Sequence, residues 1–120
     1  MRFLVLIHDE TDGSAGEPPA ALLDAVGSFR AEAADGRWLD DGGLAPASDA
    51  VLVRADGGRT TVHDGPFAEA KEVIGGFFVV ESPSPSAMAR WTETFVGLHA
   101  THWPALSFTA EVRQIVDPPS

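Results

Sequence analysis

The sequence predicts an α+β fold, in which a ferredoxin-like antiparallel sheet carries two helices on one face. Two observations lead to this prediction. The 120 residues suffice for one domain with one core. Hydrophobic patterns follow the order strand, helix, strand, hairpin, strand, helix, strand. That order is the split βαβ arrangement of ferredoxin-like domains, whose helices both cover the same face of the sheet.

Residues 1–36 predict a strand followed by a helix. Residues 3–7 (FLVLI) are apolar on both alternating faces, which is typical of a central strand covered on both sides. Pro18 and Pro19 stand where a helix begins, and Gly36 follows the apolar repeat as a stop. The apolar residues with helical spacing between them, which would face the sheet, are Leu22, Val26, Phe29 and Ala33.

The middle of the chain predicts a short strand and a hairpin. Residues 38–45 form an irregular strand that the pair Gly42-Gly43 interrupts. Residues 51–54 and 60–63 flank the sequence ADGGR. Because glycine tolerates positive φ, this sequence predicts the tight turn of a hairpin.

The last third of the chain predicts a strand, a helix and a final strand. Residues 73–81 are the strongest strand prediction, and in the SPSPS run that follows either Ser84 or Ser86 can cap a second helix. Residues 108–116 alternate like a strand, and two prolines then end the ordered chain, so residues 117–120 are expected to be a disordered tail. The apolar stripe of the second helix consists of Met88, Trp91, Phe95 and Leu98.

Composition excludes several classes of function. The formal net charge is −10, with eight Lys and Arg against eighteen Asp and Glu, so a nucleic acid is not expected as a partner. The chain contains no cysteine, which excludes disulfides, thiolate zinc sites and cysteine nucleophiles. The start, MRFLVLIHDE, reads as a strand rather than a signal peptide, and no apolar run approaches the roughly 20 residues that span a bilayer. We therefore expect a cytoplasmic protein with no membrane partner.

One stretch, DGPFAEAKEVIGGF at residues 64–77, resembles the signature of the DGPF proteins, a branch of the YCII-related family. The resemblance includes the opening strand RFLVLI, the hairpin before the signature and the closing TAEVRQI. It implies a single YCII-related (DGPF) domain over residues 1–120 that forms homodimers of the dimeric α+β barrel type. The doubly apolar first strand agrees with this expectation, because a second copy would cover the sheet face that the helices leave free.

The same resemblance implies less about activity. The family's proposed acid–base pair is a His on the first helix and an Asp near the second, and some members are linked to sigma factors. The first predicted helix of this chain, PPAALLDAVGSFRAEA, contains no histidine. The family's proposed base therefore has no counterpart here, and whether the protein is an enzyme stays open.

Candidate site residues gather in the signature. Asp64 either accepts hydrogen bonds from the loop backbone, as Asp often does in turns, or acts as a base in a pocket. Gly65 supplies the conformation of the loop. Lys71, the only lysine, either bridges neighbouring glutamates or holds an anionic ligand. Gly75 and Gly76 in a strand indicate a bulge or a close approach of backbone or ligand, and both alternatives keep a cavity nearby.

Further candidates lie outside the signature. His8 ends the first strand, on the same face as Leu4 and Leu6, and is the second catalytic candidate besides Asp64. Arg113, on the last strand with Glu111, is a ligand-binding candidate. His63 should point away from Asp64, its neighbour in the same strand. The pair His99 and His102 has metal-ligand spacing, but a solvated helix end is the better interpretation, so neither metal nor cofactor is expected.

The function that these residues favour is binding of a small, anionic molecule in a pocket between sheet and helices near the DGPF loop. Acid–base catalysis there would use Asp64 or His8. The alternative is a non-catalytic protein-interaction or regulatory module, linked to sigma-factor systems through the family resemblance. A pocket with titratable groups of altered pKa would favour the first alternative.

Overall fold

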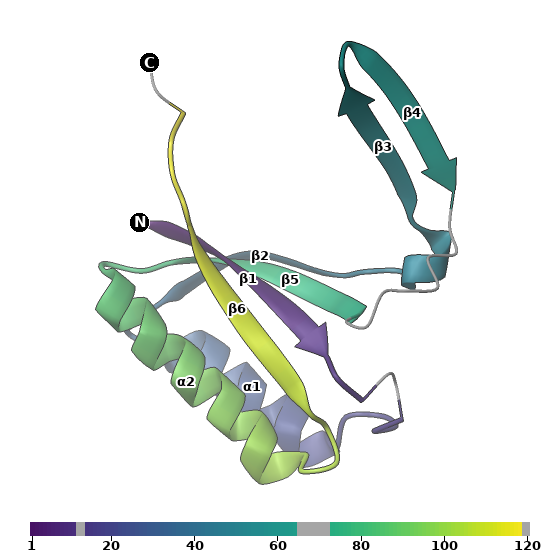
Figure 1. Cartoon of the computed structure of the whole chain (residues 1–120). Coiled ribbons are helices and arrows are strands. Elements are labelled where there is room, and N and C mark those ends of the chain that lie inside the picture. The colour runs from purple at the N-terminus through teal and green to yellow at the C-terminus, as the bar shows by residue number, and fades with distance from the viewer. Residues whose placement is uncertain (12–13, 65–72, 119–120) are drawn as a thin grey trace.

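The computed structural model describes residues 1–11, 14–64 and 73–118. The order of helices and strands is the predicted one, apart from one added short 3₁₀ turn (Figure 1). The elements are β1 (Arg2–Asp9), α1 (Ala20–Glu32), β2 (Arg37–Gly43), η1 (Ala47–Asp49), β3 (Val51–Asp56), β4 (Arg59–Asp64), β5 (Val73–Glu81), α2 (Pro85–His102) and β6 (Phe108–Ile115).

Four strands form an antiparallel sheet in the order β2-β5-β1-β6. The strands β1 and β2, which α1 connects, are separated by β5, and this is the split βαβ arrangement of ferredoxin-like domains. Both helices lie on one face of the sheet and pack against each other (Figure 1). The predicted α+β class with two helices on one face is confirmed.

The core lies between this sheet face and the helices. Phe3 and Val5 of β1 are buried there, together with Trp91 and Phe95 of α2. The alternate residues of β1, such as Leu4, point to the opposite face and are only half-buried. The helices therefore cover β1 on one side, and the other side of the sheet, which we call the open face, is partly exposed.

Both helices begin as the sequence predicts. Pro19 immediately precedes α1. Ser84 rather than Ser86 caps α2, since its side-chain oxygen accepts a hydrogen bond of 3.0 Å from the backbone N–H of Ala87. Gly36 does more than follow the first helix, because the buried ring of Trp91 packs directly on it.

The irregularity predicted for β2 is present but lies at a different residue. Gly42-Gly43 continue the pairing with β5, so they do not interrupt the strand as expected. The register instead shifts at Leu39, between Trp38 and Asp40. One extra residue at this point places Trp38 and Asp41 on the same face, where the indole Nε1 donates a hydrogen bond of 2.7 Å to the Asp41 carboxylate.

The hairpin β3–β4 forms a separate two-stranded sheet, which we call the ribbon (residues 51–64). Gly57 and Gly58 at its tip have φ of 57° and 82°, as a type I′ turn requires, so the predicted turn chemistry is confirmed. Figure 1 shows the ribbon projecting away from the four-stranded sheet. Among the described residues, no helix is both long and apolar enough to cross a membrane.

Candidate functional site

The two signature glycines that the structure describes mark a defect in the sheet. Ile7 of β1 pairs with Gly76, whereas the next residue, His8, pairs with Ile74, so Gly75 is an extra residue in β5. A Cβ on Gly76 would lie 3.1 Å from the carbonyl oxygen of Gly42 on β2. The bulge and the close backbone approach, which the sequence left as alternatives, thus both occur, at adjacent residues.

Gly75 lines two cavities between the sheet and the helices. Both also contact Ile7 and Phe95, so they adjoin at these residues. The cavity at the C-terminal end of α2, which we call the α2 cavity, has a volume of about 260 Å³, and the neighbouring one towards α1 has about 330 Å³. The residues that line the α2 cavity are Ile7, Asp9, Gly75, Phe95, His99, Trp103, Leu106 and Phe108.

His99 is the chemically most versatile side chain of the α2 cavity. Its ring packs between Phe95 and Phe108, with centroids 4.6 and 5.0 Å away. Its Nδ1–H donates a hydrogen bond of 2.9 Å to the Phe95 carbonyl, so Nε2 is the nitrogen that can accept one from a ligand. Burial lowers the pKa of His99 more than this hydrogen bond raises it. The shift favours the neutral imidazole, and the half-buried ring differs from the solvated helix end that the sequence predicts.

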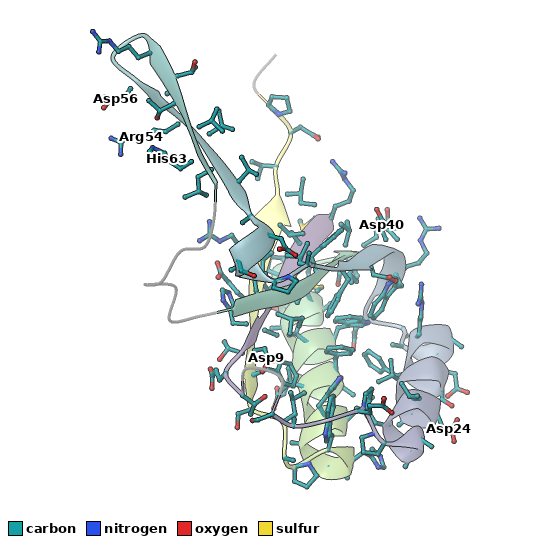
Figure 2. All side chains as sticks on the ribbon, turned by 90° about the vertical axis from the view of Figure 1, so that its right-hand side faces the viewer. Asp9, Asp24, Asp40, Arg54, Asp56 and His63 are labelled. Atoms are coloured by element: carbon teal, nitrogen blue, oxygen red, sulfur yellow. The ribbon has the colours of Figure 1, made fainter. Side chains whose placement is uncertain are left out.

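Asp9 brings a carboxylate to the same cavity. It is the last residue of β1 (Figure 2), and its Oδ1 accepts hydrogen bonds from the backbone N–H and the hydroxyl of Thr11, at 2.8 and 2.6 Å. These bonds hold the carboxylate in a turn beside the cavity. Asp9 and His99 thus add hydrogen-bond acceptors to a mainly apolar wall. Sequence reasoning did not select Asp9, because its place opposite α2 follows only from the packing.

The open face of the sheet carries a second polar cluster. His8, whose side chain is 13% exposed, donates from Nε2 to Oε1 of Glu111 at 2.9 Å. Arg113 donates from Nε to the other carboxylate oxygen of Glu111. These hydrogen bonds, from Arg113 first and then from His8, hold the pKa of Glu111 below its ordinary value. Two predicted site residues are therefore joined through a carboxylate that the sequence did not single out for this role.

The predicted site residues do not form one constellation. Gly75 and Gly76 line cavities on the helix side, whereas His8 and Arg113 lie on the open face. Gly65 and Lys71, together with the side chain of Asp64, lie outside the described residues.

No histidine of the described residues belongs to a group that could hold a metal ion. His63 lies on the exposed ribbon, where Figure 2 shows it away from the helices. In the part of the chain that the structure describes, no three His, Asp or Glu side chains gather closely enough to hold a metal ion. His99 and His102 therefore have no third potential metal ligand near them among those residues.

Comparison with known proteins adds the family. A family model described as "YCII-related domain" matches residues 1–95, which extend from β1 into α2. An uncharacterised protein of Rhizobium meliloti (strain 1021) is 44% identical over 41 residues, which are 34% of this chain and 33% of that protein. The chain thus matches about a third of the length of this relative. The family part of the resemblance seen in the sequence is confirmed, and the description does not name the DGPF branch.

Proposed function

This chain belongs to the YCII-related domain family, and we propose that it is a homodimer that binds a small, mainly apolar molecule in the α2 cavity. The observation that carries the proposal is the composition of the cavity wall. Aromatic and aliphatic side chains make up most of it, and Asp9 and His99 add two acceptors. An apolar pocket with few convergent polar groups is the usual form of a small-molecule site.

The acceptors of the cavity define the class of ligand. A carboxylate and a neutral imidazole with an available Nε2 accept hydrogen bonds, so a bound molecule should present N–H or O–H donors. The anionic ligand expected from the sequence relied on Lys71 and Arg113. Arg113 faces the opposite side of the sheet, and Lys71 lies outside the described residues. We therefore propose a neutral or cationic aromatic ligand for the α2 cavity.

Acid–base catalysis is the second part of the proposal. A neutral imidazole beside the ligand can take up a proton, and the lowered pKa of His99 keeps it in the form that does so. On the open face, His8 would act with Glu111 and Arg113 on a ligand that two subunits enclose. For the signature residues Asp64, Gly65 and Lys71 we keep the alternative roles that the sequence predicts.

The homodimer is proposed from the open face. Leu4, Leu6, Phe77 and Val79 place half-buried apolar side chains on it. Water contact with this surface is unfavourable, and a second copy would remove it through a two-fold interface. The closed, barrel-like dimer that the family resemblance implies has this arrangement.

Three probes of matched shape and different charge test the ligand class. We expect tryptamine and indole to bind, because both present N–H donors to the acceptors of the cavity. Indole-3-acetate should bind at least about tenfold more weakly, because its carboxylate would face the carboxylate of Asp9. Binding would be measured by titration in ¹H–¹⁵N correlation spectra. The largest shifts are expected at Gly75, His99 and Phe108.

A matched pair of variants locates the site. Gly75→Leu should fill the cavity, and its Cβ has room because it would meet only the Asp9 Cβ at 3.9 Å. Gly43→Leu, at a position with nothing within 4 Å of a Cβ, is the control. Probe binding that is lost in the first variant and kept in the second supports the proposal. If none of the probes shifts these amides, the interaction-module alternative is favoured instead.

A further inference from the structure

The ribbon has one apolar face. Because β-strand side chains alternate, Val51, Val53 and Ala55 of β3 share a face with Val62 of β4, which pairs directly with Val53. Val51, Val53 and Val62 are 55%, 68% and 64% exposed. Three β-branched apolar side chains thus stand side by side in water.

The opposite face of the ribbon is mainly polar. Arg54 pairs with Thr61 on this face and forms an ion pair of 3.4 Å with Asp56. His63 pairs with Leu52, the apolar residue of this face within residues 51–63. Figure 2 shows Arg54, Asp56 and His63 along the projecting ribbon, apart from the helices. The ribbon is therefore amphipathic, as a sheet is when one face packs on another surface.

The helices and the four-stranded sheet that the structure describes do not supply this surface. The extensive contacts of β3 and β4 are with each other, among the described helices and strands. A two-stranded hairpin alone is at best marginally stable in water, and it needs further strands or a packing partner. The alternation of the ribbon therefore indicates a partner outside the subunit.

The dimensions of the subunit agree with this inference. A compact monomer of 12.6 kDa exposes about 6,200 Å², whereas this chain exposes 8132 Å². Its radius of gyration is 16.6 Å, compared with about 14 Å for a compact domain of this length. The excess of about 1,900 Å² is larger than the roughly 800 Å² per partner that a standard interface buries. The subunit has enough exposed surface to form an extensive interface.

We propose that the ribbon is a dimerisation arm, whose face of Val51, Val53 and Val62 packs on a second copy of this chain. The proposal rests on the homodimer proposed above. The second copy is the occupant because each subunit has two apolar β-surfaces that are exposed or half-exposed, namely the ribbon and the part of the open face around Leu4 and Val79. In a two-fold dimer, the ribbon of each subunit would pack on the open face of the other, so that both kinds of surface are covered in both subunits.

The sizes of the two surfaces also match. A ribbon strand of six residues spans about 20 Å. Four strands at about 4.8 Å spacing form a surface of similar width. One arm can thus extend across the sheet of the partner.

Sedimentation equilibrium with two neighbouring substitutions on β4 tests the arm. Val62→Asp should raise the dimer dissociation constant at least about thirtyfold, because it puts an unpaired charge in the place of a buried apolar group. Thr61→Asp, on the polar face, is the matched control and should change the constant less than about threefold. Val79→Lys probes the open face separately, and it should also dissociate the dimer.

The outcomes separate the arm from the dimer. A wild-type monomer at micromolar concentration would overturn both proposals. A dimer that Val79→Lys dissociates and Val62→Asp leaves unchanged would overturn the arm alone. Hydrogen exchange of the wild-type protein covers the case in which Val62→Asp does not fold. The amides of residues 51–63 should then exchange more slowly as the protein dimerises, whereas concentration-independent exchange would refute the arm and assign the ribbon to a different partner.

Discussion

Replacement of Gly36 by alanine is expected to destabilise the protein, although glycine-to-alanine changes usually stabilise. A Cβ at this position would lie 2.6 Å from Cδ1 of Trp91 and 2.8 Å from Cγ1 of Val80. Trp91 is 2% exposed and stacks on Phe95 with a centroid distance of 5.5 Å. The indole therefore cannot move away without disturbing the aromatic core.

The magnitude follows from two opposing effects. Overpacking of a well-packed core costs about 1–3 kcal/mol. Alanine also has less backbone freedom than glycine in the unfolded chain, which stabilises the folded protein by about 0.4–1 kcal/mol. The net expected loss is about 1–2 kcal/mol, or a decrease of about 4–8 °C in Tm at this chain length. Urea unfolding followed by tryptophan fluorescence would measure it, at one fixed protein concentration because the proposed dimerisation would contribute to stability.

Gly27 provides the matched control. It lies in α1, is exposed, and has nothing within 4 Å of the position that a Cβ would occupy. Gly27→Ala should therefore stabilise by up to about 1 kcal/mol through helix propensity alone. Opposite signs for the two variants would confirm that Trp91 packs on Gly36. If Gly36→Ala is as stable as the wild type or more stable, the packing described for Trp91 is wrong.

Two further predictions concern α2. Ser84→Ala should lower the free energy of unfolding in urea by about 1 kcal/mol, because the helix cap is lost. Ser86→Ala, two residues further along, should leave it nearly unchanged. Burial holds the pKa of His99 in the folded protein below 6.5. As the pH falls, the unfolded chain therefore binds the proton first. The free energy of unfolding should be highest above pH 6.5 and should decrease as the pH falls below that value. His99→Gln should flatten this dependence relative to His102→Gln, and an unchanged slope would contradict the burial of His99.

The sequence predicted the order and type of the elements because each depends on local patterns. Pro19 at the start of α1, Ser84 at the cap of α2, and the glycines at the tip of the ribbon all act within a few residues of their position. The bulge at Leu39 was not predictable in this way. It depends on how Trp38 and Asp41 pack against the neighbouring α1 and against β5, which lies more than 30 residues further along the chain.

The candidate site was predictable only where one residue type indicates a particular local structure. Two glycines in a strand indicated a bulge with a cavity beside it, and both are present at Gly75. By contrast, the cluster of His8 with Glu111 depends on the register between the first and last strands. The burial of His99 depends on Phe108, which packs over its ring from β6. Interactions between distant segments of this kind leave no pattern in a single sequence.

The bulge at Gly75 also links the two surfaces of the sheet. Because side chains alternate along β1, the consecutive residues His8 and Asp9 point to opposite faces. His8 joins the Glu111 cluster on the open face, and Asp9 lines the α2 cavity. Both residues pair with β5 beyond the bulge, opposite Ile74 and Val73. A second subunit on the open face would therefore contact the strand segment that shapes the cavity, and ligand binding and dimerisation would be coupled through the end of β1.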